Sequence, residues 1–152
     1  KTLALNDNNL SGDIFQKFSG AGYDKIYLNN NNFTSAFPDL RNCPNLFVFS
    51  AQNNQLSGYV PGSLSSNTKL VYLQLSNNKF TGPDGSAIIN DLYLNYLANP
   101  SRASVNVILT NQNGLTEFTV NNDGTFGENS TANKLAILKS ADWSISLDGS
   151  TV

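Results

Sequence analysis

The sequence predicts an α/β fold: a solenoid with a parallel sheet on its concave face, mostly irregular or 3₁₀ segments on its convex side, and a C-terminal α/β cap with about two helices. Two observations predict it. A unit of 23 or 24 residues recurs four times in the first half of the chain, which is the signature of stacked repeats. After residue 83 the apolar residues change to helical spacing. We therefore expect repeats over residues 1–83 and a capping region of helices and strands over residues 84–152 that continues the solenoid.

The repeats share an alternating apolar pattern that ends in an asparagine. The four copies read LALNDNNLSG, IYLNNNNFTS, FSAQNNQLSG and LQLSNNKFTG, at residues 3–12, 26–35, 49–58 and 73–82. Their phased asparagines are Asn8, Asn31, Asn54 and Asn78, spaced by 23, 23 and 24 residues. Four copies in phase make a chance origin implausible.

Each repeat is expected to form a short strand followed by a polar turn. Alternate apolar residues such as Leu73 and Leu75 bury one face of the strand, and successive strands lie side by side in a parallel sheet. At the turn, the four asparagine side chains bond backbone groups that no strand partner reaches, which forms a buried ladder. An apolar residue then fills the core two positions later, at Leu10, Phe33, Leu56 and Phe80.

This pattern, L-x-x-L-x-L-x-x-N-x-L, resembles that of the leucine-rich repeat family over residues 1 to 82. The stretches LSGDI, LSGYVP and FTGP, which begin at residues 10, 56 and 80 after the phased asparagine, are similar to the L-S/T-G-x-I/V-P extension of plant-type repeats. In the second copy Ser35 stands where a glycine is expected. The resemblance implies outer segments that are extended or 3₁₀ rather than long helices.

The chain beyond Gly82 predicts two helices and three strands. A helix over residues 84–99 has Asp84 or Ser86 as its cap and ends before Pro100, and it would cover the outer face of the sheet. A second helix is expected over residues 130–140. Alternating apolar residues predict strands at 105–109, 116–120 and 143–147.

This tail also resembles the ends of repeat domains in tailed-phage and bacterial surface proteins. The segments that carry the likeness are INDLYLNYL, NKLAIL and ADWSI, at residues 89–97, 133–138 and 141–145. Those domains often close with a lysine-glycine-tryptophan-threonine strand, and here Ala141 and Asp142 precede the tryptophan. The likeness implies a virion or fibre protein. In physical terms the same segment caps the apolar end of the solenoid.

The composition excludes several classes of function. The chain has no His and one Cys, so it cannot form a Ser-His-Asp or Cys-His pair, an imidazole or thiolate zinc site, or an internal disulfide. We expect no enzyme activity, no cofactor and no metal. The net charge of −2 offers no surface that neutralises phosphates, and no apolar run approaches the roughly 20 residues that span a bilayer. Nucleic acid and a membrane span are therefore not expected.

The outward side chains of the predicted sheet form the candidate ligand-binding surface. They are Asn6, Asp7, Tyr27, Asn29, Asn30, Ser50, Gln52, Asn53, Tyr72, Gln74, Ser76 and Asn77. A rigid surface needs little ordering on association. Amides and hydroxyls suit a glycan or a peptide backbone, and the two tyrosines supply stacking area. The alternative is that these amides bond one another across the strands.

These observations predict a non-enzymatic recognition or adhesion module of a larger surface-exposed protein, such as a phage virion or fibre protein, that binds glycan or protein through its concave face. One alternative is a structural spacer or decoration domain that stacks on other subunits of a virion or surface assembly. Another is a fragment of a plant-type extracellular receptor. The expected location is extracellular or on the virion surface. Because residue 1 is Lys rather than Met, we expect a fragment or a processed form.

Three N-glycosylation sequons begin at Asn9, Asn32 and Asn129. The chain holds 24 Asn, 17 Ser and 10 Thr. Such a composition produces about four sequons by chance, so their number does not by itself indicate glycosylation.

Overall fold

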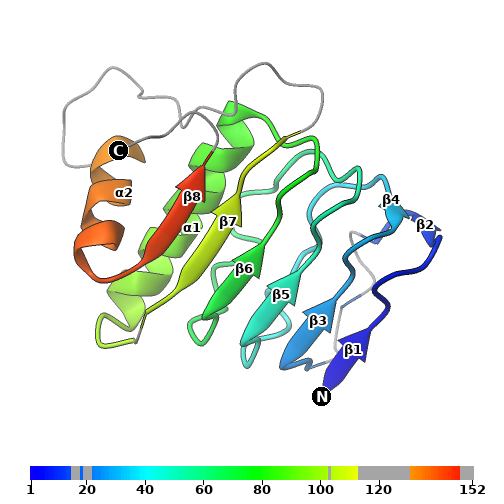
Figure 1. Ribbon diagram of the computed structural model, residues 1–152. Coiled ribbons are helices and arrows are strands. Elements are labelled where there is room, and N and C mark those ends of the chain that lie inside the picture. Colours follow the sequence, from blue (N-terminus) through cyan, green and yellow to red (C-terminus); the bar gives the residue numbers. More distant parts are fainter. Residues whose placement is uncertain (15–17, 19–21, 103, 113–130, 148–152) are drawn as a thin grey trace.

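The main feature of the fold is one parallel sheet of six strands. The computed structural model describes residues 1–152 except 15–17, 19–21, 103, 113–130 and 148–152. The strands are β1 (Thr2–Ala4), β3 (Lys25–Tyr27), β5 (Val48–Ser50), β6 (Tyr72–Gln74), β7 (Asn106–Leu109) and β8 (Ser144–Leu147). Their spatial order follows their order in the chain, so each repeat adds one strand beside the last (Figure 1). The predicted α/β solenoid with a parallel sheet is confirmed.

The strands pair in a register that keeps one row of apolar side chains in the core. The row consists of Leu3, Ile26, Phe49, Leu73, Val107 and Ile145. The four central members are fully buried. Because side chains alternate between the two faces of a strand, a slip of one residue would expose this row to water.

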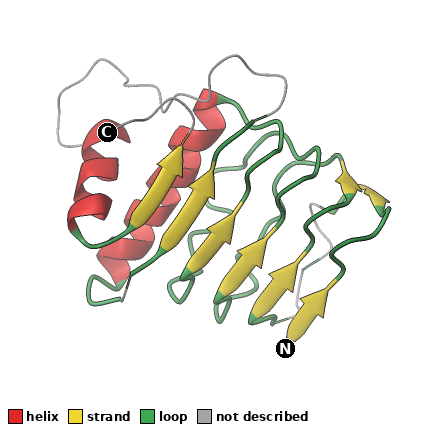
Figure 2. Ribbon diagram, in the orientation of Figure 1, coloured by secondary structure: helices red, strands yellow, loops and turns green. Residues whose placement is uncertain are grey.

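Two helices cover the outer face of the sheet at its C-terminal end (Figure 2). They are α1 (Gly82–Ala98), between β6 and β7, and α2 (Thr131–Ser140), between β7 and β8. The earlier outer segments contain turns, and their described residues form no helix, as predicted. A small second sheet pairs β2 (Ser11–Gly12) with β4 (Asn32–Phe33). No helix in the described ranges is long and apolar enough to cross a membrane.

The predicted tail elements are observed except where they fall outside the described residues. The strand expected at 116–120 lies in that excluded range. The strands β7 and β8 extend the same sheet in register with β6. The single cysteine, Cys43, is fully buried, as expected of a small core residue.

The first repeat departs from the prediction that its core positions are buried. Leu10 is 39% exposed and Leu5 is 36% exposed, whereas the equivalent Phe33 and Leu28 are 4% and 0% exposed. The difference arises because, among the described residues, only the second repeat packs against the first. The repeats of β3, β5, β6 and β7 each have a neighbour on both sides.

The start of α1 also differs from the prediction. The cap is Thr81, not Asp84 or Ser86. Thr81 Oγ1 accepts a hydrogen bond from the Asp84 backbone N–H, and the Asp84 carboxylate accepts one from the Thr81 N–H at 2.7 Å. This reciprocal capping box starts the helix inside the repeat, with Pro83 in its first turn.

Replacing the cap residue tests this helix start. We expect Thr81→Ala to lower the free energy of unfolding by about 1 kcal/mol, because it removes one acceptor for the unpaired amides of the first helical turn. Urea denaturation followed by circular dichroism measures the change. The matched control is Ser57→Ala, since Ser57 follows its core residue in the same way but precedes no helix. Equal effects of the two substitutions would contradict this assignment of the cap.

Candidate functional site

A buried ladder of side-chain amides runs beneath the edge of the sheet and positions the residues above it. Asn54 is representative. Its Nδ2 donates to the carbonyl oxygens of Leu28, in the preceding repeat, at 3.0 Å and of Ala51, in its own repeat, at 3.2 Å. Its Oδ1 accepts from the Phe33 N–H at 3.0 Å. The side chain therefore joins the end of one strand to the turn of the repeat before it.

The neighbouring asparagines repeat this geometry. Asn31 accepts from the Leu10 N–H, and Asn78 accepts from the Leu56 N–H, at 3.0 and 2.9 Å. Both side chains are buried and also donate to a carbonyl of the preceding repeat. Asn8, the first member of the predicted ladder, is exposed, and among the described residues it donates only to carbonyls of its own repeat. The ladder thus becomes buried from the second repeat onward.

Gln112 extends the ladder into the tail, which the sequence analysis missed. Its Oε1 accepts from the Phe80 N–H at 3.2 Å, and its Nε2 donates to the carbonyl oxygens of Leu109 and Leu75. The side chain is 2% exposed. The available signal was the likeness of LTNQ at residues 109–112 to LSNN at residues 75–78. The insertion of α1 hid it by lengthening the interval from Asn78 to 34 residues.

Removing a buried ladder amide should destabilise the chain. We expect Asn54→Ala to cost about 1–3 kcal/mol of unfolding free energy, because the Phe33 N–H and the Leu28 carbonyl lose their partner inside the protein. Chemical denaturation measures the loss. Asn8→Ala is the matched control and should cost less, because Asn8 is exposed. An Asn54→Ala variant as stable as the parent would count against the ladder.

A second, exposed ladder uses four of the predicted site residues. Asp7, Asn30, Asn53 and Asn77 occupy left-handed turn positions with φ between 56° and 59°. Asn77 Nδ2 donates to Asn53 Oδ1 at 2.6 Å, Asn53 donates to Asn30 at 2.5 Å, and Asn30 donates to the Asp7 carboxylate. These amides bond one another from repeat to repeat, as in the alternative considered above. Their polar groups are thus already engaged along the stack.

The pKa of the Asp7 carboxyl lies below its ordinary value because Asn30, and then Asn6, donates hydrogen bonds to it. A carboxyl whose pKa is lower in the folded chain than in the unfolded chain stabilises the fold above its unfolded pKa. That contribution is lost as the pH falls through the folded pKa. The junction between the first two repeats should therefore loosen at acid pH.

A pH titration tests this junction. We expect the carboxyl carbon resonance of Asp7 to titrate below the range of ordinary aspartates, and we expect faster amide exchange at the first junction as Asp7 becomes protonated. Asp7→Asn, which cannot ionise, is the control and should show no such pH dependence. An ordinary or raised titration midpoint for Asp7 would contradict the inferred bonding.

The face of the sheet opposite the helices corresponds to the predicted concave face, and we keep that name for it. Strand pairing places its side chains in two rows. The first row is Thr2, Lys25, Val48, Tyr72, Asn106 and Ser144, and the second is Ala4, Tyr27, Ser50, Gln74, Ile108 and Ser146. The members from β7 and β8 are not among the predicted site residues, which end at Asn77. Lys25 is the one charged residue in these two rows.

The predicted site residues on this face differ in what they can offer a ligand. Ser50 and Ser76 are 5% and 8% exposed. Ser50 Oγ donates to Gln52 Oε1 at 2.6 Å, and Gln74 Oε1 accepts from the Ser76 N–H at 3.1 Å, so both glutamine oxygens already have a donor.

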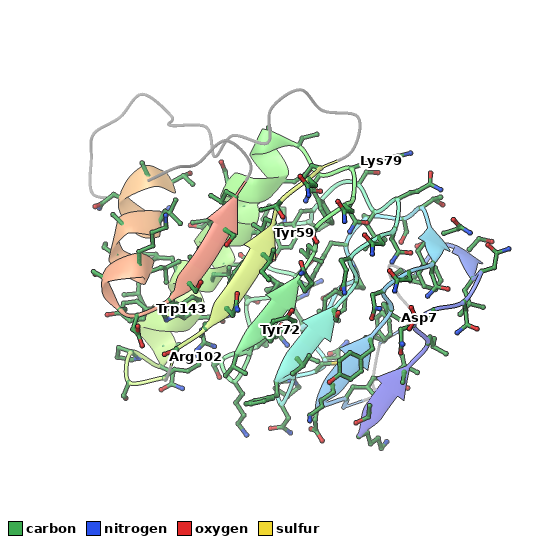
Figure 3. The ribbon with its side chains drawn as sticks, in the orientation of Figure 1. Asp7, Tyr59, Tyr72, Lys79, Arg102 and Trp143 are labelled. Carbon is green, nitrogen blue, oxygen red and sulfur yellow. The ribbon has the colours of Figure 1, made fainter. Side chains whose placement is uncertain are left out.

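Other predicted site residues remain available. Asn29 and the hydroxyls of Tyr27 and Tyr72 make no side-chain hydrogen bond with the described residues, and all three side chains are partly exposed. Asn6 donates to Asp7 Oδ2 at 2.5 Å. Figure 3 shows Tyr72 on β6 and Asp7 beyond the end of β1. The surface that can make new contacts therefore centres on the two tyrosines and Lys25.

Two further polar clusters lie away from this face and serve the fold. Asp91 on α1 accepts from Tyr59 Oη at 2.5 Å and from the Gly62 N–H at 2.8 Å. Burial, and then the Asp91 carboxylate, raises the pKa of Tyr59. The Arg102 guanidinium lies 4.5 Å from the ring centroid of Trp143, and burial lowers its pKa to about 10. Both clusters join the repeats that contain helices to their neighbours.

Within the described residues no group of carboxylates and thiols could hold a metal ion.

Comparisons with known proteins point to one repeat family. Residues 69–90 match the family described as Leucine Rich Repeat. The chain is 36% identical over 77 residues to Receptor-like kinase TMK4 of Arabidopsis thaliana. The matched residues are 51% of this chain and 8% of that protein. It is 41% identical over 58 residues to Receptor protein kinase WSS1 of Oryza sativa subsp. japonica, covering 38% of this chain and 6% of that protein.

A third relative extends the pattern. The chain is 36% identical over 70 residues to Cuscuta receptor 1 of Solanum lycopersicum, covering 45% of this chain and 6% of that protein. The chain thus spans less than a tenth of the length of each of these relatives. Together with the fold, the matches support a leucine-rich repeat family. They give no support to the phage-like interpretation of the tail.

Proposed function

We propose that this leucine-rich-repeat solenoid is a non-enzymatic protein-recognition module of a larger extracellular receptor of the plant type. The observation that carries the proposal is the concave face, where Tyr27, Tyr72 and Lys25 project from strands fixed by the buried ladder. The partner is a protein segment that lies across the strands. This is the receptor alternative of the sequence analysis rather than its main interpretation.

The concave face has the properties of a preorganised binding surface. Its strands are held in register from repeat to repeat, so little conformational entropy is lost when a partner binds. Tyrosine contributes a large contact area and a hydroxyl at low entropic cost, and it is enriched among the residues that dominate binding energies. Val48 lies next to Tyr72 in the first row and adds apolar area between the two tyrosines.

The relatives favour a receptor over the other candidates. Two of the three are receptor kinases by name and the third is a receptor. The virion interpretation rested on the tail. That segment, in its described part, continues the repeat sheet rather than forming a distinct module. A glycan ligand is disfavoured because the turn amides bond one another and the side-chain oxygens of Gln52 and Gln74 already have donors.

Selection from a randomised peptide library displayed on phage tests the proposal. We expect peptides that bind the parent chain to lose at least about tenfold in affinity for the Tyr27→Ala/Tyr72→Ala variant, because two aromatic anchors are removed. Surface plasmon resonance measures the affinities, and circular dichroism checks that the variant is folded.

The matched control is Lys79→Ala. Lys79 belongs to the same repeat as Tyr72 but lies at the opposite end of it (Figure 3). We expect this variant to bind the selected peptides as the parent does. Peptides that bind the double tyrosine variant unchanged, or that lose affinity only for Lys79→Ala, would contradict recognition through the concave face.

A further inference from the structure

The rim of the solenoid carries a column of polar side chains just beyond the buried ladder. Its members are Asn9, Asn32, Gln55 and Lys79, each directly following a ladder asparagine. Asn32 Nδ2 donates to Asn9 Oδ1 at 2.5 Å, and Lys79 Nζ donates to Gln55 Oε1 at 2.9 Å. Asn9 and Asn32 are both exposed. The two asparagine side chains therefore lie next to each other on the surface.

The two N-glycosylation sequons of the described chain coincide with this rim. Asn9 precedes Leu10 and Ser11, and Asn32 precedes Phe33 and Thr34. Ser11 and Thr34 are exposed as well. No ladder asparagine and no concave-face asparagine begins a sequon. Both acceptor asparagines and both hydroxyl residues therefore lie at the surface of the rim.

We propose that Asn9 and Asn32 form a rim site for N-linked oligosaccharide. The inference rests on the proposed extracellular location. The donor is an oligosaccharide linked to a lipid pyrophosphate. A bond forms between the asparagine Nδ2 and the anomeric carbon, the bond from that carbon to the pyrophosphate oxygen breaks, the lipid pyrophosphate leaves with the electron pair, and Nδ2 releases one proton.

The geometry accommodates this modification without breaking the rim. A glycosylated amide keeps one hydrogen on Nδ2, so Asn32 can carry a glycan and still donate to Asn9 Oδ1. The glycan also lies beside Leu10, whose exposed apolar surface it would shield from water. Attachment of the glycan breaks no buried hydrogen bond.

The position of the rim determines what a glycan would leave open. Lys79, the fourth member of the column, lies at the opposite end of its repeat from Tyr72 (Figure 3). Sugars on Asn9 and Asn32 would therefore occupy the end of the first two repeats away from Lys25. A partner would reach the concave face from the side of Lys25 and Tyr72.

Secretion of the full chain from cultured mammalian cells tests the site. We expect peptide-N-glycosidase to lower the mass of the secreted protein and to convert Asn9, Asn32 or both to aspartate, as read by peptide mass mapping. Modification of either residue supports the site. Secreted protein in which both residues are unmodified would overturn it.

Substitutions in the third sequon position give matched controls. Thr34→Ala removes the acceptor sequence but keeps the Asn32 side chain and its bond to Asn9, whereas Thr34→Ser retains the acceptor. Ser11→Ala and Ser11→Thr make the same pair for Asn9. We expect each occupied site to lose its glycan only in the alanine variant, and a glycan that persists there would contradict attachment by this route. Peptide binding through Tyr27 and Tyr72 is a separate readout, so either proposal can fail alone.

Discussion

The fold depends on buried side-chain amides that supply the hydrogen bonds a short strand cannot. The strands of the main sheet are three or four residues long, and beyond them the chain turns away from its neighbours. Buried backbone groups without partners cost about 1–3 kcal/mol each. Asn31, Asn54 and Asn78 satisfy these groups across each junction, and they do so inside the protein, where hydrogen bonds are electrostatically stronger than in water. The turns they stabilise direct Phe33, Leu56 and Phe80 into the core.

The same constraint explains how the solenoid accommodates a much longer repeat. The α1 helix enlarges the outer side of its repeat, yet β7 pairs with β6 in the register of the earlier strands. Each repeat contacts only its neighbours, so an insertion on the outer side does not disturb the inner row. Gln112 completes the ladder here, with the same kinds of backbone partner as the asparagines. The concave face therefore runs without a break across all six strands.

Sequence periodicity predicted the repeats, the strands and the ladder because each rests on spacing alone. Periodicity did not predict features where an insertion interrupts the spacing, or where the exposure or bonding of a side chain depends on the adjacent repeats. Gln112 escaped notice because a helix separates it from Asn78. The exposure of Leu10 depends on which repeats lie beside it. Asn30 and Asn53 bond each other because their left-handed turns stack in space. The sequence alone therefore could not show which amides bond one another and which are available to a ligand. The strands of the tail that resembled a phage protein continue the repeat sheet.

Hydrogen exchange at the ladder junctions tests this account most directly. The N–H groups of Phe33, Leu56 and Phe80 lie outside the main sheet, and each donates to a ladder side chain. Nuclear magnetic resonance can follow each of these amides separately. The account predicts that they exchange as slowly as the amides of the core strands β5 and β6. Exchange of these three amides at the rate of an unprotected chain, while the strands stay protected, would contradict it.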